Sequence, residues 1–127
     1  MRILGIDYGK RKMGLSIAAG KLAEPHSVVK VNSDEEAQDK IGRVVREEGI
    51  EKIVVGVSEG KMGKDSELFG KKLKEDLGVP VEFEDETLSS RDSQRLSIAA
   101  GLSRKKRKEL EDAFAAAVML QSYLERR

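Results

Sequence analysis

The sequence predicts a single α/β domain in which a mixed five-stranded sheet carries helices on both faces. The first third of the chain has three segments of strand length separated by turns, which is typical of antiparallel hairpins. Helical periods and apolar strand-length runs then alternate, which indicates parallel strands joined by helical crossovers. At 127 residues the chain can hold one core, so we predict one domain over residues 1–127.

Three N-terminal strands are predicted over residues 2–7, 13–18 and 27–31. The first is an apolar run that stops at Asp7, and the second alternates apolar with small or polar residues. The lone His26 precedes the third strand and has no cysteine or second histidine with which to share a metal ion. We therefore expect His26 in a loop or at an edge of the sheet.

A helix is expected to begin at Ser33, which forms the sequence of a capping box with Glu36. Apolar residues follow at helical spacing until Gly49, a residue type that commonly ends a helix in the left-handed conformation. Residues 53–57 are almost unbroken apolar sequence, which is typical of a strand covered on both faces. A glycine-rich loop is predicted over residues 58–64.

The second half of the chain is expected to alternate helix and strand again. Helices are predicted over about 66–77 and, from Ser89 or Ser90, to about Ala100, with a strand over 80–86 between them. A basic run follows Ser103 and leads into a last helix. That helix has an apolar face, and its alanines would let it approach a sheet closely.

Composition excludes several classes of protein. Charged residues make up 37% and hydrophobic residues 39% of the chain, which indicates a folded protein with a heavily charged surface. The net charge of +1 favours no class of partner, and the lack of cysteine excludes disulfides and thiolate metal sites. No apolar run is long enough to span a membrane, and the N-terminus does not have the pattern of a signal peptide. We expect a cytoplasmic protein that contacts no membrane.

Acidic residues stand where the predicted strands end. Asp7 ends the first strand, Glu59 follows the fourth, and Asp85 and Glu86 end the fifth. Such strand ends should lie at one edge of the sheet, where ligands of these folds bind. Asp112 lies near the start of the last helix, on its otherwise apolar face. Only one of the two adjacent acids can face this site, because side chains alternate along a strand.

A cluster of carboxylates without cysteine or a second histidine favours the hard cations Mg²⁺ or Mn²⁺. Two such ions would support an in-line phosphodiester displacement, which needs no nucleophile from the protein. Each acid also has a structural interpretation. Asp7 could shape a turn, Glu59 could pair with Lys61 or Lys64, and Asp112 could stabilise a helix N-terminus. Their convergence on one edge favours the metal site.

Two cationic segments flank these acids. A run of cations is usually a solvated stretch, but these two lie beside the proposed site, where a polyanion would bind through its phosphates. Aromatic residues make up only 4% of the chain, which favours recognition of the backbone or shape over base stacking. The predicted nucleic-acid-binding residues are Lys10, Arg11, Lys12, Arg104, Lys105, Lys106, Arg107 and Lys108.

Four groups of motifs along the chain carry a family resemblance. They are Gly5-Ile6-Asp7-Tyr8-Gly9 with Arg11 and Gly14-Leu15; Val54-Val55-Gly56; Asp85-Glu86 with Leu88-Ser89-Ser90; and the run from Ser103 to Lys108 leading to Asp112, Ala115-Ala116 and Leu120-Gln121-Ser122-Tyr123-Leu124. In this order they span the chain and resemble the YqgF/RuvX family, the Holliday-junction-resolvase-like branch of the ribonuclease H superfamily.

The resemblance implies an RNase H-like fold and a metal-dependent nuclease that matures the 5′ end of pre-16S rRNA during ribosome biogenesis. It implies that Asp7, Glu86 and Asp112 form the site. After Val-Val-Gly the family usually has a loop that contains Leu-Pro, whereas this chain has Glu59 there. Glu59 could restore the strand-four acid of RuvC-type resolvases or be a lineage-specific loop residue.

Other functions stay open at this point. The same chemistry would serve a Holliday junction resolvase on branched DNA, which should be a symmetric dimer because it makes paired cuts. A non-catalytic nucleic-acid-binding ribosome-assembly factor is the alternative of another class. A sugar-kinase-type ATPase ranks last, because that group needs two such domains. The expected partners are structured precursor rRNA or branched DNA and a pre-ribosomal particle, and the expected state is a monomer or weak homodimer.

Overall fold

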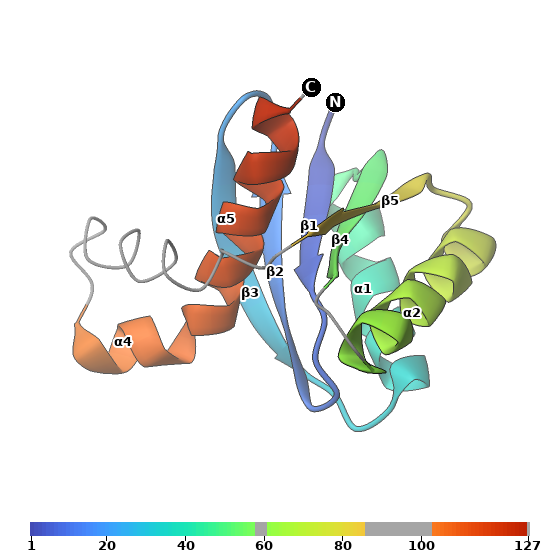
Figure 1. Cartoon of the computed structure of the whole chain (residues 1–127), viewed down its shortest axis with the longest axis horizontal. Helices are drawn as coiled ribbons and strands as arrows, with labels where there is room; N and C mark the ends of the chain where they lie inside the picture. The colour runs from blue at the N-terminus through green and yellow to red at the C-terminus, as the bar shows by residue number, and fades with distance from the viewer. Residues whose placement is uncertain (58–60, 86–102, 127) are drawn as a thin grey trace.

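The computed structural model describes residues 1–57, 61–85 and 103–126. Within these residues, five strands form one sheet in the order β3-β2-β1-β4-β5 (Figure 1). The strands are β1 (Ile3–Asp7), β2 (Lys12–Ala18), β3 (Ala23–Lys30), β4 (Lys52–Val57) and β5 (Val81–Asp85). The helices are α1 (Asp34–Glu48), α2 (Lys61–Leu77), α4 (Arg104–Glu109) and α5 (Glu111–Glu125).

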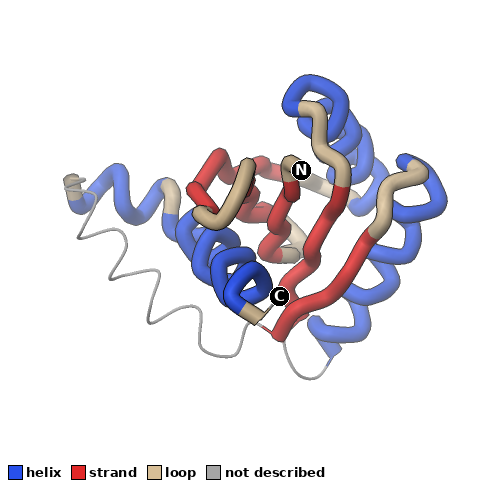
Figure 2. The backbone as a smooth tube through the Cα atoms, turned by 90° about the horizontal axis from the view of Figure 1, so that it is seen from above, coloured by secondary structure: helices blue, strands red, loops and turns tan. Residues whose placement is uncertain are grey.

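The sheet is mixed, as predicted. Strand β2 is antiparallel to both β1 and β3, whereas β4 runs parallel to both β1 and β5. The carboxyl ends of the three parallel strands, at Asp7, Val57 and Asp85, therefore lie at one edge, which we call the carboxyl edge. Helices α1 and α2 cover one face and α5 covers the other (Figure 2). This arrangement confirms the predicted fold class.

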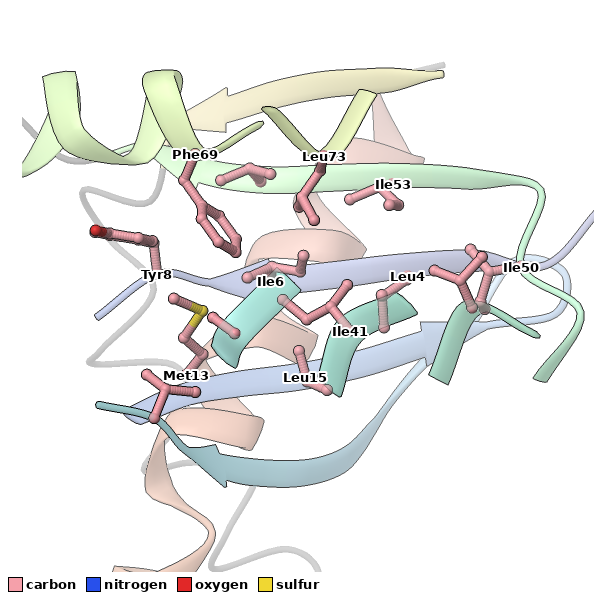
Figure 3. Packing of buried hydrophobic residues seen from close by; sticks show 14 residues of the cluster. Leu4, Ile6, Tyr8, Met13, Leu15, Ile41, Ile50, Ile53, Phe69 and Leu73 are labelled. Atoms are coloured by element: carbon pink, nitrogen blue, oxygen red, sulfur yellow. The ribbon is translucent and has the colours of Figure 1, made fainter. Parts of the chain in front are cut away.

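The larger core cluster lies between the sheet and the layer of α1 and α2 (Figure 3). Leu4 and Ile6 of β1 are fully buried there, together with Ile41 of α1 and with Phe69 and Leu73 of α2. Burying each such side chain contributes about 1.5–3 kcal/mol. A second cluster lies beneath α5, so the central strands are covered on both faces. Its buried members are Ile3, Ala18, Val54, Met119, Leu120 and Tyr123.

Helix α1 has the ends that the sequence predicts. The Ser33 hydroxyl accepts a hydrogen bond from the backbone N–H of Glu36 at 3.1 Å, and the Glu36 carboxylate accepts one from the N–H of Asn32 at 3.1 Å. The arrangement is a variant of the capping box, in which the Glu36 carboxylate binds the N–H of the residue before the cap instead of that of Ser33. Gly49 ends the helix at φ 63°, in the left-handed region. The Lys40 ammonium, followed by the Asn32 N–H, lowers the pKa of the Glu36 carboxyl.

Helix α2 begins earlier than predicted. It starts at Lys61, so residues 61–64 of the predicted loop are helical. Ser66 is a buried residue inside the helix, where its hydroxyl donates to the carbonyl oxygen of Gly63 at 2.8 Å. The prediction was wrong because Gly63 disfavours a helix by only about 1 kcal/mol, which the packing of the remaining turns offsets.

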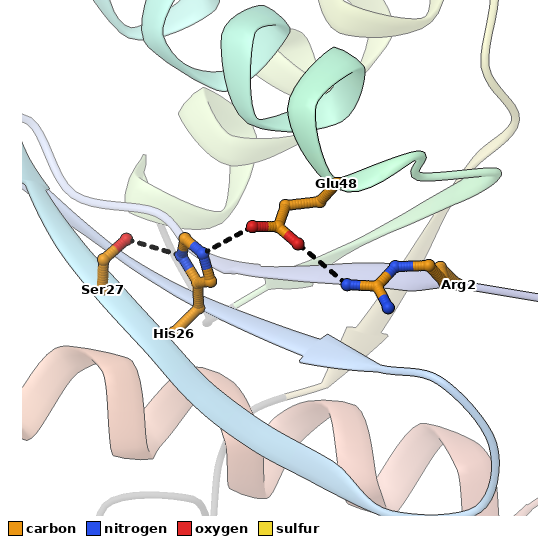
Figure 4. Close-up of polar contacts among 4 residues, drawn as sticks. All are labelled: Arg2, His26, Ser27 and Glu48. Carbon is orange, nitrogen blue, oxygen red and sulfur yellow. Dashed lines mark hydrogen bonds and ion pairs between the residues drawn. The ribbon is translucent and has the colours of Figure 1, made fainter.

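Strand β3 is longer than predicted and includes Pro25 and His26. Because β3 is an edge strand, a proline without an N–H is tolerated there. The imidazole of His26 lies 3.4 Å from the Glu48 carboxylate, which also binds Arg2 at 2.9 Å (Figure 4). These contacts tie β3 and the residue before β1 to the end of α1, away from the carboxyl edge. His26 is an edge residue, as expected.

The basic run forms its own short helix before the last one. Ser103 caps α4 by accepting a hydrogen bond from the N–H of Lys106 at 3.2 Å. The chain bends at Leu110, whose φ of −103° and ψ of 8° separate α4 from α5. The helix predicted over about 89–100 lies outside the described residues. Within the described part of the chain, no helix has both the length and the apolar character needed to cross a bilayer.

Candidate active site at the carboxyl edge of the sheet

Asp7 is the last residue of β1, and its register defines the candidate site. It pairs with Gly14 of β2 and with Gly56 of β4. Side chains alternate along β1: Ile6 enters the cluster beneath α1 and α2, whereas Ile3 enters the cluster beneath α5. Asp7 therefore projects on the α5 face, between two strand neighbours that have no side chains to crowd it.

Asp112 reaches the same corner from the first turn of α5. A Cβ atom added to Gly14 would lie 1.8 Å from the carbonyl oxygen of Asp112 and 2.7 Å from the backbone nitrogen of Ala113. The start of α5 thus rests directly on the backbone of Gly14. Because Gly14 pairs with Asp7, the first turn of α5 lies beside the strand end that carries Asp7. The Lys12 ammonium lies 3.2 Å from the Asp112 carboxylate.

The acidic residues of β5 lie on different faces of the sheet. Glu82 and Glu84 both accept hydrogen bonds from side chains of α5. Phe83 lies on the other face, because its ring approaches α2. Alternation then puts Asp85 on the α2 face, opposite to Asp7. The pleat therefore argues against Asp85 as a partner of Asp7, and the other predicted acid, Glu86, lies outside the described residues.

Glu84 is an acid that the sequence analysis did not single out. Its side chain is only 7% exposed. It accepts a hydrogen bond from the Ser122 hydroxyl at 3.2 Å and lies 3.4 Å from the Arg126 guanidinium. Glu84 shares a row of the sheet with Asp7, with Gly56 between them. The alternation of acids at 82, 84 and 86 was the available signal. Glu84 fastens the end of α5 to the sheet and so helps to position the whole helix.

The remaining candidate ligands, Glu59 and Glu86, lie outside the described residues. Among residues 1–57, 61–85 and 103–126, no group of three or more His, Cys, Asp or Glu side chains is placed to hold a metal ion. Asp7 and Asp112 supply two carboxylates, and hard divalent cations prefer such oxygen donors. The donor chemistry therefore fits Mg²⁺ or Mn²⁺, while the full ligand set stays a prediction.

The predicted cationic residues lie close to this corner. Lys10 and Lys12 reach acids of the neighbouring helices, Asp65 of α2 at 3.8 Å and Asp112 of α5 at 3.2 Å. Both lysines and Arg11 are exposed. Helix α4 leads directly into the turn of α5 that carries Asp112 (Figure 1). Its exposed cations with described side chains are Arg104, Lys105, Lys106 and Lys108.

Comparison with known proteins shows which family the chain belongs to. A family model, RuvX, described as Holliday junction resolvase, matches residues 1–126. The chain belongs to the RuvX family. A relative from Leuconostoc mesenteroides is 35% identical over 136 residues, covering 98% of this chain and 95% of the relative. A Bacillus cereus relative is 38% identical over 138 residues and covers 100% of both chains. Both relatives bear the name "Putative pre-16S rRNA nuclease".

The fold of this RuvX chain is also found in solved resolvase structures. The structure of T. thermophilus RuvC in complex with Holliday junction substrate superposes with a TM-score of 0.68 over 99% of this chain and 96% of that chain. The two sequences are 18% identical, so the likeness concerns the fold alone. The family match and this superposition confirm the resemblance and the RNase H-like fold expected from the motifs.

Tyr8 follows Asp7 directly and points into the core of this RuvX domain, on the α1 and α2 side. Its ring lies 5.3 Å from that of Phe69, centre to centre, and its hydroxyl donates to the Asp34 carboxylate at 3.2 Å. Burial, followed by the negative charge of Asp34 and the hydrogen bond to it, raises the pKa of Tyr8 to about 12. The phenol therefore stays neutral well above the pH at which it ionises in the unfolded chain.

This pKa predicts a loss of stability in alkali. Because the folded pKa is raised above the ordinary 10.0, the contribution of Tyr8 is complete below pH 10 and is lost as the pH rises towards 12. Denaturant midpoints should fall over this range in the wild type and fall less in Tyr8→Phe. Ultraviolet absorbance of the ionised phenol, taken as wild type minus Tyr8→Phe, isolates the titration of Tyr8. A difference titration centred at the ordinary pKa of tyrosine would contradict this interpretation.

Proposed function

We propose that this chain is a metal-dependent endonuclease that hydrolyses phosphodiester bonds and processes the 5′ end of precursor 16S rRNA during ribosome biogenesis. The observation that carries the proposal is the direct contact of Gly14 with the first turn of α5, which puts Asp112 beside the strand end that carries Asp7. Membership of the RuvX family supports phosphodiester hydrolysis, and the names of the curated relatives support an RNA substrate.

The proposed ligand set consists of Asp7, Asp112, Glu86 and Glu59. When bound, two Mg²⁺ or Mn²⁺ ions supply Lewis-acid stabilisation of an in-line displacement and make water a better nucleophile. The chain itself contributes positioning. The strand end fixes Asp7, and the contact with Gly14 fixes the start of α5. Lys12, 3.2 Å from the Asp112 carboxylate, reduces the repulsion that two nearby carboxylates would otherwise have.

The cations of the β1–β2 turn and of α4 would hold phosphates on either side of the bond to be cut. We propose that the substrate is structured precursor rRNA in a pre-ribosomal particle, and that the protein acts in the cytoplasm as a monomer or weak homodimer. The scarcity of aromatic residues supports binding through the backbone rather than through stacked bases.

A Holliday junction resolvase is the second candidate, because the matching family model carries that description. A resolvase cuts two strands symmetrically and therefore requires a two-fold arrangement of two active sites. The mass of the protein in size-exclusion chromatography with light scattering tests this requirement. A strict monomer in the presence of a DNA four-way junction would count heavily against a resolvase.

A ribosome-assembly factor without turnover is the candidate from another class. It would need the cationic surfaces but not the acids. It predicts that cells in which Asp7→Asn replaces the wild type process their ribosomal RNA normally. The proposed nuclease predicts that precursor rRNA with an unprocessed 5′ end accumulates in those cells.

Metal removal tests the proposed function directly. The purified protein should cut a precursor RNA with a 5′ extension when Mg²⁺ or Mn²⁺ is present, should stop when a chelator is added, and should recover when the metal is restored. A DNA four-way junction is offered in parallel, and preferential cutting of the junction would favour the resolvase. Cutting that persists in excess chelator would contradict the metal site. A parallel preparation of Asp7→Asn controls for contaminating nucleases.

A further inference from the structure

A hollow lined by cations lies beside the candidate active site, between the β1–β2 turn, the end of β3 and the start of α1. Its volume is about 830 Å³. We call it the cationic hollow. Among the described residues, five cations line it against one acid, so its lining carries a net positive charge; Lys10 and Lys12 also contact Asp65 and Asp112, which lie outside the lining. The charged residues of the lining are Lys10, Arg11, Lys12, Lys30, Lys40 and Glu36.

Two lysines of the cationic hollow form a pair of like charges that the fold does not require. Lys12 and Lys30 stand directly opposite each other in the β2–β3 pair. Like charges at such positions destabilise a sheet, and a neutral residue at either position would remove the repulsion. Residues that break a local rule of stability are often found at functional sites. Asp112 pairs with Lys12 at 3.2 Å and offsets part of this repulsion, whereas among the described residues no ion pair engages Lys30. Lys30 therefore adds a positive charge at this end of the sheet that an external anion could neutralise.

Hydrogen bonds to backbone carbonyl oxygens hold the cationic hollow in shape. The N–H of Val31 donates to the carbonyl oxygen of Arg11 at 2.8 Å, which ties the β1–β2 turn to the end of β3. The Lys40 ammonium donates to the carbonyl oxygen of Lys30 at 2.5 Å, which ties α1 to the same point. The one acid, Glu36, is already engaged by Lys40 at 3.0 Å. The acid therefore offsets little of the charge that Lys30 and Arg11 present.

The cationic hollow is linked to the candidate active site through Lys12. Lys12 lines the hollow and also lies 3.2 Å from the Asp112 carboxylate. Helix α4, with its exposed cations, leads into Asp112 along the chain. The pair of Asp7 and Asp112 thus lies next to two basic surfaces, the cationic hollow and α4.

We propose that the cationic hollow binds the phosphodiester backbone of the substrate strand where it continues past the cleavage site, with Lys30 and Lys40 as phosphate-binding residues. This inference rests on the proposed function. Among the described residues, the lining has no aromatic side chain for a base to stack on, and its cations come from a turn, two strand ends and a helix. Such a surface suits an extended polyanion whose sequence is not read.

Substitution of Lys30 tests the proposal, because it separates binding from folding. Binding is measured by fluorescence anisotropy with a labelled RNA hairpin that has a single-stranded 5′ extension, in the Asp7→Asn background so that the probe stays intact. We expect Lys30→Gln to weaken binding about threefold to tenfold and to reduce the slope of log affinity against log salt by about 0.7 to 0.9. We expect its melting temperature to stay equal or to rise, because the repulsion by Lys12 is removed. With Asp7 restored, KM should rise while kcat changes little.

The double variant Lys30→Gln/Lys40→Gln should lose about twice as much of the salt slope. The matched control is Lys71→Gln/Lys72→Gln on the exposed surface of α2, which should keep the wild-type affinity and slope. Unchanged binding and slope in the Lys30 and Lys40 variants would overturn the proposal, as would a loss of binding that only follows the unfolded fraction. These results would overturn only the proposed role of the cationic hollow. The proposed function would fail by a different result, in which Asp7→Asn cuts RNA as well as the wild type does.

Discussion

Replacement of Asp7 by asparagine is expected to lower the rate of RNA cleavage by at least about 10²-fold, which corresponds to about 3 kcal/mol of lost transition-state stabilisation. Asp7 ends β1 on the α5 face, beside the turn of α5 that carries Asp112. Asparagine keeps the shape of the side chain and one oxygen but removes the negative charge that a divalent cation requires. The measurement is single-turnover cleavage of a 5′-extended precursor RNA at saturating metal.

Binding of Mn²⁺, followed by electron paramagnetic resonance, supplies a second readout that does not depend on turnover. The wild type should bind the ion, and Asp7→Asn should bind it much more weakly. The matched control is Asp85→Asn, which removes the same charge at the same edge from a residue on the opposite face of the sheet. That variant should keep most of the cleavage. Equal cleavage rates for the wild type and Asp7→Asn would contradict the proposed metal site.

The order and type of the described helices and strands could be predicted from the sequence, because the residue patterns that start and end them lie within short stretches of the chain. Ser33 and Gly49 both satisfy backbone groups of the same helix, so a short stretch of sequence contains the whole signal. The start of α2 could not be predicted in the same way. Ser66 has the residue type of a helix cap, yet its hydroxyl bonds to the carbonyl of Gly63 within the helix. Tertiary packing decides between these two uses of a serine.

The candidate site was predictable in part, and the limit has a physical cause. That Asp7 lies at the carboxyl edge follows from the strand pattern and from the rule for parallel sheets. Which acid of β5 faces Asp7 depends on the pleat, and the contacts of Glu84 and Phe83 with opposite helix layers decide it against Asp85. The cross-strand pair of Lys12 and Lys30 depends on the register of two strands, which alternating patterns alone do not fix.

The approach of α5 to the sheet could be expected from its alanines, but the point of contact could not. Gly5 and Gly14 of the two central antiparallel strands both face α5. A Cβ atom at Gly5 would meet the Ser16 hydroxyl at 2.4 Å and would reach α5 at 3.0 Å from Leu120 Cβ, whereas one at Gly14 would lie 1.8 Å from the backbone oxygen of Asp112. A side-chain hydroxyl can rotate away, but a helical backbone moves only as a unit. Gly14 is therefore the position that limits how closely the first turn of α5 approaches β2.

Gly14→Ala is accordingly expected to reduce both stability and cleavage. The added methyl group would lie 1.8 Å from the carbonyl oxygen of Asp112, so the first turn of α5 must move away from β2. Overpacking of this kind destabilises a protein by about 1–3 kcal/mol, and urea unfolding measures that loss. A misplacement of about 1 Å at a catalytic group can lower the rate by about 10²-fold. Cleavage is therefore measured at a temperature where circular dichroism shows the variant to be folded.

The control for Gly14→Ala is Gly20→Ala, where an added Cβ atom meets nothing within 4 Å, and which should leave stability and cleavage near the wild-type values. The comparison separates two roles of Gly14. If the glycine only permits tight packing, the folded variant will cut at the wild-type rate and only the urea midpoint will fall. If the contact positions Asp112, the folded variant will lose activity, and raising the Mn²⁺ concentration will restore part of it, because a displaced ligand weakens metal affinity. We expect the second result, because a methyl group 1.8 Å from the carbonyl oxygen of Asp112 forces the turn that carries Asp112 to move.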